Sequence, residues 1–251
     1  MDEPAVTAEL IIEDQGAVRI LRMNRPDKLN ALNTSLTEGL CNALEAASVD
    51  EGVRAIVLTG VGRAFCAGAD TGEFAQLQPG NAELVARRAD LTCHLHDLLR
   101  AVPKPLISAV RGAAVGGGAG LAIGCDMMVA GEDIRFGYPE LRHGLVPALV
   151  MTSLVRQIGR KLAFEMVSTG RMLDAAALRK YHLVNRIVPP AEVVDVAVAL
   201  AETCAAFSGL SMQATKILFH QVAELPFAQA MLAGRDMNIK MRGLAKSAGE
   251  T

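Results

Sequence analysis

Tryptophan is absent from the 251-residue chain, and all aromatic residues together make up 4% of it. Large rings that could stack on nucleic-acid bases are therefore scarce. Excess positive charge is also missing, because 25 Lys and Arg stand against 27 Asp and Glu, for a formal net charge of −2. Nucleic-acid binding needs a concentrated basic surface, so the composition predicts no nucleic-acid partner.

Long uncharged apolar runs are missing as well. The most apolar stretch, residues 110–130, contains Arg111 and Asp126, whereas a membrane helix needs about 20 continuous apolar residues. The first ten residues are acidic and hold no apolar core of a signal peptide. We therefore expect neither a membrane-spanning segment nor a secretion signal.

Paired cysteines and clustered metal ligands are a third absence. The five cysteines are odd in number, and no two are spaced as C-x-x-C, so neither a zinc site nor a disulfide framework is indicated. His94 and His96 are two residues apart, a spacing that puts them on different faces of a helix. The sequence predicts free thiols, a reducing cytoplasmic location and no bound metal.

The first part of the chain alternates between the apolar patterns of strands and of helices. Strands are predicted over residues 17–23, 54–59, 106–110, 127–130 and 134–136. Helices are predicted over residues 36–47 and 82–101. Asn33 and Thr34 are the capping candidates at the start of the first helix.

From residue 151 onward the apolar spacing is helical, apart from a short strand predicted at residues 184–188. The predicted helices cover residues 151–158, 162–168, 174–181, 193–207, 211–222 and 227–241. We therefore expect an α/β core over residues 1–195 and a helical region over residues 196–251. The last helices carry apolar residues such as Phe219 and Met231. We expect this region to lie against neighbouring subunits and to cover an active site.

Two glycine-rich segments each follow a predicted strand: Phe65–Asp70 (FCAGAD) and Val115–Gly120 (VGGGAG). Small side chains let a ligand approach the main chain, and the first N–H groups of a helix have no partner within it. Two such N–H groups from separate loops could hold one oxygen as it becomes negative. Close helix–strand packing is the alternative. A dinucleotide-binding loop is disfavoured. The acidic residue that binds the ribose should end the next strand, and after residues 127–130 the sequence offers only Glu132 and Asp133.

Glu140 follows the short strand predicted at residues 134–136 and lies in Pro-Glu-Leu, between apolar neighbours. A carboxyl group in that setting is expected to be desolvated, which raises its pKa and suits it to proton transfer. A surface glutamate, or one in an ion pair with Arg142, is the alternative.

In order and spacing, these segments resemble the crotonase family, which includes enoyl-CoA hydratases and isomerases. The segments that carry the resemblance are Asn24–Leu32 (NRPDKLNAL), Arg63–Asp70 (RAFCAGAD), Lys104–Gly118 (KPLISAVRGAAVGGG), Cys125-Asp126, Phe136–Glu140 (FGYPE), Ala163–Gly170 and Leu183–Val188 (LVNRIV). They extend over nearly the whole chain. The resemblance implies an α/β fold, a spiral of ββα units with a C-terminal helical extension, assembled as a trimer or a dimer of trimers.

The resemblance also implies roles for particular residues. The N–H groups of Ala69 and Gly117 would form an oxyanion hole for a thioester oxygen, and Glu140 would be the acid/base. The ligand would be an acyl-coenzyme A thioester, with no separate cofactor because coenzyme A is part of the substrate. Lys240 would lie near the nucleotide, from a neighbouring subunit. The other substrate-binding residues would be Lys28, Leu29, Ala31, Ala67, Asp70, Gly116 and Pro139.

One position departs from the hydratases of that family. Their second catalytic glutamate would lie three residues after the glycine of the oxyanion hole, where this chain has Gly120. Hydration usually divides the work on water and on C2 between two carboxylates, whereas a double-bond shift needs one base that moves a proton from C2 to C4. Residues 144–151 (GLVPALVM) are also bulkier than the glycine-rich run that helps many hydratases to position water. The sequence therefore favours an enoyl-CoA isomerase.

Two other hypotheses stay open. The first is a hydratase, or another crotonase reaction such as C–C cleavage or decarboxylation, in which His143, Tyr138 or Asp70 replaces the second acid. The second belongs to another class: a protein that binds acyl-CoA without turning it over, as the missing carboxylate at Gly120 suggests.

Overall fold

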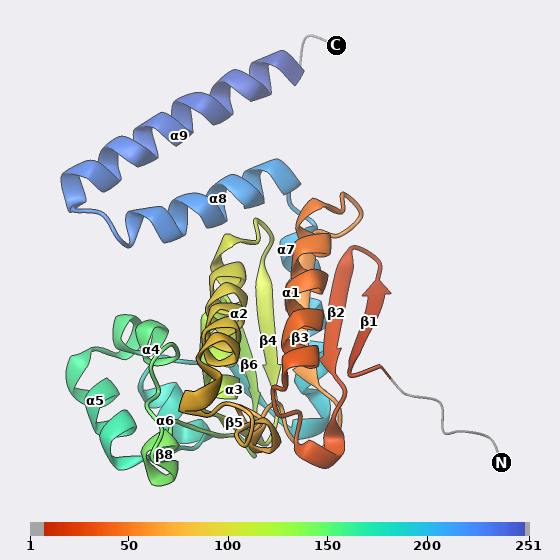
Figure 1. Cartoon of the computed structure of the whole chain (residues 1–251). Helices are drawn as coiled ribbons and strands as arrows, with labels where there is room; N and C mark the ends of the chain where they lie inside the picture. The colour runs from red at the N-terminus through yellow and green to blue at the C-terminus, as the bar shows by residue number, and fades with distance from the viewer. Residues whose placement is uncertain (1–7, 249–251) are drawn as a thin grey trace, which may run out of the picture.

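A six-stranded sheet with the order β1-β2-β3-β4-β6-β9 forms the centre of the computed structural model, which describes residues 8–248 (Figure 1). The strands are β1 (Leu10–Gln15), β2 (Val18–Met23), β3 (Ala55–Gly60), β4 (Leu106–Val110), β6 (Met127–Gly131) and β9 (Arg186–Val188). β1 pairs antiparallel with β2, and all the other neighbours are parallel. Parallel neighbours need crossover connections, and these carry the helices.

Helices cover both faces of this sheet: α1 (Thr34–Val49) and α3 (Gly117–Gly124) pack on one face, and α7 (Val193–Ala205) packs on the other. The other helices are α2 (Ala82–Ala101), α4 (Met151–Ile158), α5 (Arg160–Thr169), α6 (Ala175–Lys180), α8 (Gly209–Val222) and α9 (Phe227–Ala248). Asn33 caps α1, because its side chain accepts a hydrogen bond from the N–H of Leu36 at 2.8 Å. The cap predicted at Asn33 is confirmed.

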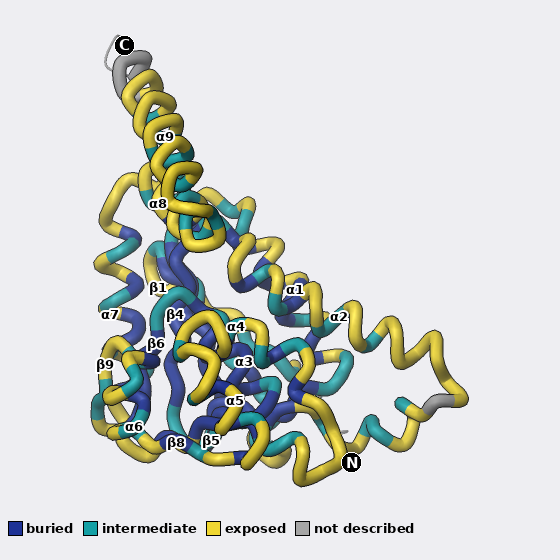
Figure 2. Tube along the Cα trace, turned by 90° about the vertical axis from the view of Figure 1, so that its left-hand side faces the viewer, coloured by how far each residue is buried: buried dark blue, intermediate teal, exposed yellow. Residues whose placement is uncertain are grey.

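The strands are apolar on both faces because both faces are buried. In β3, Ile56 and Leu58 belong to the core that contains α1, α2 and α3, whereas Ala55 and Val57 belong to the core that contains α7. Successive side chains of a strand point to opposite faces, so a strand covered on both sides is a continuous apolar run. Figure 2 shows the buried residues concentrated along the central strands.

A second, smaller sheet lies at the lower end of the molecule in Figure 1. Its strands are β5 (Ala113–Val115), β7 (Arg135–Gly137) and β8 (Met172–Leu173), in the order β5-β7-β8. β5 directly follows β4, and β7 directly follows β6. Consecutive turns of the chain thus add one strand to each sheet before a helix returns, which is the predicted repeat of two strands and a helix.

The last two helices leave the body of the molecule. α8 is anchored by Lys216, whose buried ammonium group lies 2.7 Å from the carboxylate of Asp126 and donates to the carbonyls of Leu99 and Lys104. His220 contacts the other carboxylate oxygen of Asp126 at 3.0 Å. A buried charge is stable only when paired and hydrogen-bonded in this way.

α9 packs chiefly on α8 and projects away from both sheets (Figures 1 and 2). Large apolar side chains are exposed on these two helices: Leu210, Ile217, Phe219, Phe227, Met231, Leu232 and Ile239. No single helix within residues 8–248 is long and apolar enough to cross a membrane. The bent pair Pro190–Ala205 and Gly209–Val222 passes that test by length and composition, with 106° between its halves.

Some short elements differ from the prediction. The strands β1, β5 and β8 were not among the predicted elements. β5 and β8 have three and two residues, too few to show a periodicity. The boundary predicted between residues 195 and 196 falls inside α7, which packs on the sheet.

Candidate active site

The loop after β3 is held against β5 by two main-chain hydrogen bonds. The N–H of Cys66 donates to the carbonyl of Ala113 at 2.9 Å, and the N–H of Val115 donates to the carbonyl of Cys66 at 3.0 Å. β5 in turn pairs with β7, and the N–H of Gly116 donates to Gly137 at 2.9 Å. The two glycine-rich segments and the strand that leads to the predicted acid are therefore neighbours in one row.

The other side of the same loop pairs with the turn after β2. The N–H of Leu32 donates to Gly68 at 2.7 Å, and the N–H of Asp70 donates to Leu32 at 3.0 Å. This parallel bridge uses the carbonyl of Gly68 and the N–H of Asp70, which flank Ala69. It does not use the N–H of Ala69 itself. In the described part of the chain, no acceptor lies on that N–H.

The N–H of Gly117 is the second free donor expected here, because Gly117 is the first residue of α3 and the first N–H groups of a helix have no intrahelical acceptor. A Cβ placed on Gly117 would lie 3.8 Å from the nitrogen of Ala69 and 3.3 Å from Cδ1 of Leu32. The two predicted donors are thus neighbours, beside an aliphatic side chain.

Two glycines allow these segments to approach so closely. Gly68 has a φ of +95°, and a Cβ there would lie 2.8 Å from the carbonyl oxygen of Val115. Gly116 has a φ of +54°, and a Cβ there would lie 3.1 Å from Oε1 of Glu140. An L side chain is disfavoured by φ at both positions and by space at the first, so glycine is required.

Glu140 begins a short 3-10 helix (Glu140–His143) directly after β7 and Pro139. Its Oε2 is buried and, among residues 8–248, has no hydrogen-bond partner. Burial raises the pKa of this carboxyl above its usual value, while its own backbone N–H and His143 oppose the shift. The alternative ion pair does not form, because Arg142 instead donates to the carbonyl of Gly170 at 3.1 Å. The carboxyl group thus has the environment of a proton-transfer group.

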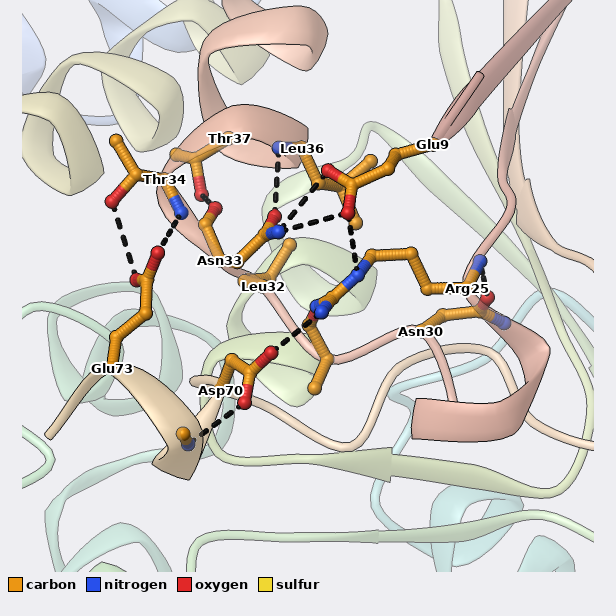
Figure 3. Close-up of polar contacts among 12 residues, drawn as sticks. Glu9, Arg25, Asn30, Leu32, Asn33, Thr34, Leu36, Thr37, Asp70 and Glu73 are labelled. Carbon is orange, nitrogen blue, oxygen red and sulfur yellow. Dashed lines mark hydrogen bonds and ion pairs between the residues drawn. The ribbon is translucent and has the colours of Figure 1, made fainter. Parts of the chain in front are cut away.

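Arg25 connects the turn after β2 to the loop that holds Ala69 (Figure 3). Its Nη2 lies 2.7 Å from Oδ2 of Asp70, its Nε lies 2.9 Å from Oε1 of Glu9, and its Nη1 donates to the carbonyl of Ala31. The hydrogen bond from Arg25 is the main cause of a lowered pKa at Asp70. Asp70 is therefore a fixed, ionised carboxylate, which disfavours it as a substitute acid.

Four residues of the predicted coenzyme A path lie close together in the fold: Lys28, Leu29, Ala31 and Ala67. Lys28 is exposed at the end of a short 3-10 helix, and its carbonyl accepts from the N–H of Ala31 at 3.0 Å. Leu29 has a left-handed backbone, and its carbonyl accepts from the N–H of Ala67 at 2.9 Å. The path leads directly to Ala69, and the role of these residues stays a prediction.

Three other singled-out residues lie elsewhere. Lys240 is exposed on α9, and within one chain that helix lies away from the smaller sheet (Figure 1). His143 is exposed at the end of the 3-10 helix. Tyr138 is fully buried in the core with its ring edge-to-face on Phe136 at 5.6 Å, and burial raises the pKa of its hydroxyl. Among the described residues, no contact of these three supports the roles suggested for them, which stay predictions.

The position of the missing second carboxylate is enclosed by two side chains. A Cβ placed on Gly120 would lie 2.6 Å from Cγ1 of Val150 and 2.8 Å from Cε1 of His96. Any side chain at residue 120 would therefore displace both of them. The sequence reasoning missed His96. One signal was available: His96 precedes the buried Leu99 by three residues on α2, and Leu99 meets α3 at Gly124.

Thiol and metal chemistry have no support at this site. Burial raises the pKa of the Cys66 thiol to about 12, so it is protonated at neutral pH and is not a nucleophile. All five cysteines are free. In the part of the chain that the structure describes, no group of three or more His, Cys, Asp or Glu is placed to hold a metal ion.

Paired amides next to a desolvated carboxyl form a site for a carbonyl oxygen and an adjacent proton. Residues 13–246 match the family described as enoyl-CoA hydratase/isomerase. The chain belongs to the enoyl-CoA hydratase/isomerase family. This match extends across both sheets and most of α9, so the family resemblance found in the sequence is confirmed.

Individual members of the enoyl-CoA hydratase/isomerase family are similar to this chain over most of its length. The Escherichia coli 2,3-dehydroadipyl-CoA hydratase is 38% identical over 231 residues, 92% of this chain and 89% of that protein. The enoyl-CoA hydratase structure from Mycobacterium smegmatis has a TM-score of 0.87 at 31% identity, covering 92% of this chain and 90% of its own. A Polaromonas enoyl-CoA hydratase has a TM-score of 0.88 at 28% identity, covering 96% and 97%. The predicted crotonase-like α/β fold is confirmed, and the chain is an acyl-CoA enzyme of this family.

Proposed function

We propose that this enzyme shifts the double bond of a 3-enoyl-CoA to C2, with Glu140 as the only proton carrier. The Glu140 carboxylate takes a proton from C2, and the electron pair of that C–H bond forms an enolate with its charge on the thioester oxygen. The N–H groups of Ala69 and Gly117 hold that oxygen. When the charge returns through the conjugated carbons, C2=C3 forms and C4 takes the same proton from Glu140. No atom is gained or lost.

The paired amides support the enolate step. A donor that meets a developing oxyanion contributes about 2.7–4 kcal/mol to the stability of a transition state. Donors on the main chain are already fixed in place, so they need no reorganisation during the reaction. Glu140 is suited to the proton step, because a raised pKa brings a carboxylic acid closer to the pH at which it works.

The observation that favours isomerisation is the enclosure of Gly120. The position that holds a second carboxylate in hydratases of this family has no side chain, and His96 and Val150 fill the space around it. One carboxylate is enough to move a proton from C2 to C4. Orienting and deprotonating water while protonating C2 usually requires two.

The test is turnover of a 3-enoyl-CoA by the purified full-length protein. Glu140→Gln keeps the shape of the side chain and removes its basicity, so we expect the rate to fall by about 10²–10⁴-fold. Glu132→Gln, at an exposed glutamate just after β6, is the matched control and should leave the rate unchanged. If Glu140→Gln kept full activity, the assignment would fail.

Hydration of a 2-enoyl-CoA is the second candidate. It is favoured by the names of the similar proteins, which include hydratases from Escherichia coli and Mycobacterium smegmatis. Crotonyl-CoA separates the two candidates: hydration at a rate equal to or above that of isomerisation would overturn the preference for an isomerase. Tight acyl-CoA binding with no turnover on a panel of thioesters would instead indicate a binding protein.

A further inference from the structure

His96 is a polar side chain in this site that the isomerase reaction does not use. We propose that its Nε2 binds the oxygen at C3 of the acyl group, which is the attacking water before hydration and the hydroxyl of a 3-hydroxyacyl-CoA after it. His96 is then a positioning residue that gives the pocket a capacity for hydration. The inference rests on the acyl-CoA site proposed at Glu140.

The location of the ring carries the proposal. His96 lies on α2 and reaches across to α3, where its Cε1 is 2.8 Å from the point at which a Cβ of Gly120 would stand. Cε1 is covalently bonded to Nε2, so the ring nitrogen lies close to the place of the absent second carboxylate. The helix α2 thus supplies a polar atom where α3 has no side chain.

The nitrogen itself lacks a partner. Nε2 of His96 is buried and has no hydrogen-bond partner among the described residues. Buried polar atoms are nearly always hydrogen-bonded, and each exception calls for a ligand or a water. Burial also lowers the pKa of this histidine, with Asp97 opposing the shift. A neutral imidazole with its proton on Nδ1 can accept a hydrogen bond at Nε2.

Glu140 has a matching unpartnered atom one helical turn away. The N–H of Gly120 donates to the carbonyl of Gly116 at 2.9 Å, so the two glycines are four residues apart, just over one turn and about 6 Å along the axis. Oε1 of Glu140 lies beside Gly116, and His96 lies beside Gly120. Buried Oε2 of Glu140 and buried Nε2 of His96, both without a hydrogen-bond partner among the described residues, thus belong to side chains that lie beside the first turn of α3, and the C3 oxygen is assigned to the space between them.

The proposed step balances with the groups present. One O–H of the water donates to Nε2 of His96, and the other proton passes to the Glu140 carboxylate as the oxygen forms its bond to C3. The C2=C3 electron pair moves to C1–C2, and the thioester oxygen becomes an enolate held by the two amides. The Glu140 carboxyl then gives its proton to C2 as the enolate returns to a carbonyl. Water is added, and His96 gains no net proton.

Space-filling is the competing role for His96, because Val150 fills the same region with an apolar group. The two roles differ in what they recognise. A filler affects every acyl chain alike, whereas a hydrogen-bonding nitrogen distinguishes a chain with oxygen at C3 from one without it. Binding of matched ligands therefore decides between them.

The experiment compares 3-hydroxybutyryl-CoA with butyryl-CoA by calorimetry, in the full-length Glu140→Gln protein so that neither ligand is turned over. We expect His96→Leu to weaken binding of the hydroxylated ligand by about tenfold, the value of one hydrogen bond, and to leave butyryl-CoA within about twofold. His96→Gln, which keeps a polar atom, should retain part of the preference. His94→Leu is the control, since His94 contacts Glu45 on the outer surface of α2 at 2.8 Å. Equal weakening of both ligands, or of neither, overturns the proposal.

A second measurement does not depend on the folding of His96→Leu. In the same Glu140→Gln protein labelled with ¹⁵N-histidine, the Nε2 signal of His96, assigned by its loss in His96→Gln, should shift on addition of 3-hydroxybutyryl-CoA and stay in place with butyryl-CoA. The same shift with both ligands, or with neither, contradicts the assignment.

Kinetics separates this inference from the proposed function. With Glu140 intact, His96→Leu should lower hydration of crotonyl-CoA at least about tenfold relative to isomerisation of a 3-enoyl-CoA. A proportional loss of both rates, or no hydration by the unsubstituted protein, overturns the role of His96 alone. Failure of the proposed function appears elsewhere, as full isomerisation by Glu140→Gln.

Discussion

The Glu140 carboxyl has a raised pKa and one buried oxygen that no described residue meets with a hydrogen bond. Both features have the same cause, because the side chain lies beside Gly116, at the start of α3, and is withdrawn from water. A carboxylate is disfavoured in such a place, so the protonated form persists to higher pH than in an exposed glutamate. This links the burial of one residue to the pH at which the enzyme works.

We therefore expect the acidic limb of kcat/KM to lie above the usual range of a glutamate. Below its pKa Glu140 is protonated and cannot take the C2 proton, so the rate falls as pH decreases through that value and is full above it. The profile is measured with a 3-enoyl-CoA, with circular dichroism at each pH to confirm that the fold persists. A midpoint at or below about 4.3, the value of an unperturbed glutamate, would contradict the role of burial.

The donor at Gly117 can be removed with little damage to α3. Proline is favoured at the first position of a helix, where its missing N–H has no intrahelical partner to lose. Gly117→Pro should lower kcat by about 10²–10³-fold through loss of one oxyanion donor. Gly117→Ala adds a Cβ at the same place and keeps the N–H, so the difference between the two variants measures the donor. Equal rates in both would show that this N–H does not contact the reacting oxygen.

At the scale of elements, the site depends on turns that belong to different ββα units. One bridge joins the turn after β2 to the loop after β3, and another joins that loop to β5. Each bridge has two main-chain hydrogen bonds, and a further one runs from Ala67 to Leu29. Because these pairings are short, the relative position of the segments also depends on side chains that connect one segment to another. Arg25 is the clearest case, since its guanidinium joins Asp70 to Ala31 and is 14% exposed in its side chain.

Arg25→Met should loosen this connection. Removing the guanidinium leaves Asp70 and the carbonyl of Ala31 without their partner, and an orphaned buried group costs about 1–3 kcal/mol. We expect a loss of free energy of unfolding of about that size, measured by urea denaturation, and a larger fall in kcat than in acyl-CoA affinity because Ala69 shifts. The control is Arg22→Met, which breaks a more exposed pair with Glu13 and should cost under about 1 kcal/mol. An equal loss of free energy of unfolding in Arg25→Met and Arg22→Met would contradict a special role for Arg25 in holding the loop.

The helices were predicted more accurately than the smaller sheet. Helical spacing in α2 and α7 is a property of one continuous stretch, so it can be read locally. The strands β5 and β8 exist because partners from other parts of the chain lie beside them, and their sequences are too short to carry a pattern. The oxyanion pair was predicted from the glycine-rich motifs and the family resemblance that they carry. The contacts of Arg25 and His96 were not predicted, because the local pattern around each residue does not show which residue of another element it meets.

At the scale of the whole molecule, α8 and α9 present an apolar surface that one chain does not cover. Phe227 is 81% exposed, and Ile217, Phe219 and Met231 are exposed on the same pair of helices. Clustered exposure of this kind marks an interface. We propose a trimer or a dimer of trimers joined through these helices. In that assembly, Lys240 of one copy would lie near the coenzyme A nucleotide bound by its neighbour.

Phe227→Asp should therefore reduce the oligomer to smaller species. An aspartate suits the start of α9, so the helix should persist while a charge enters the interface, and light scattering after gel filtration gives the mass. The matched control is Val49→Lys, because Val49 is also 81% exposed and a lysine suits the end of α1. An unchanged mass for Phe227→Asp, or an equal decrease for Val49→Lys, would exclude this surface.

The amino-acid sequence by itself determined the features whose cause is local: the buried strands and amphipathic helices, the glycines at the close approaches, and the family to which these motifs belong. The tertiary structure decided which groups meet. It pairs Arg25 with Asp70, and this ion pair disfavours Asp70 as the substitute acid. It also brings His96 beside Gly120, where hydratases of the family have their second carboxylate. These contacts depend on how α2 packs on α3 and on how the parallel strands align. Both are properties of the folded core as a whole and not of any one segment.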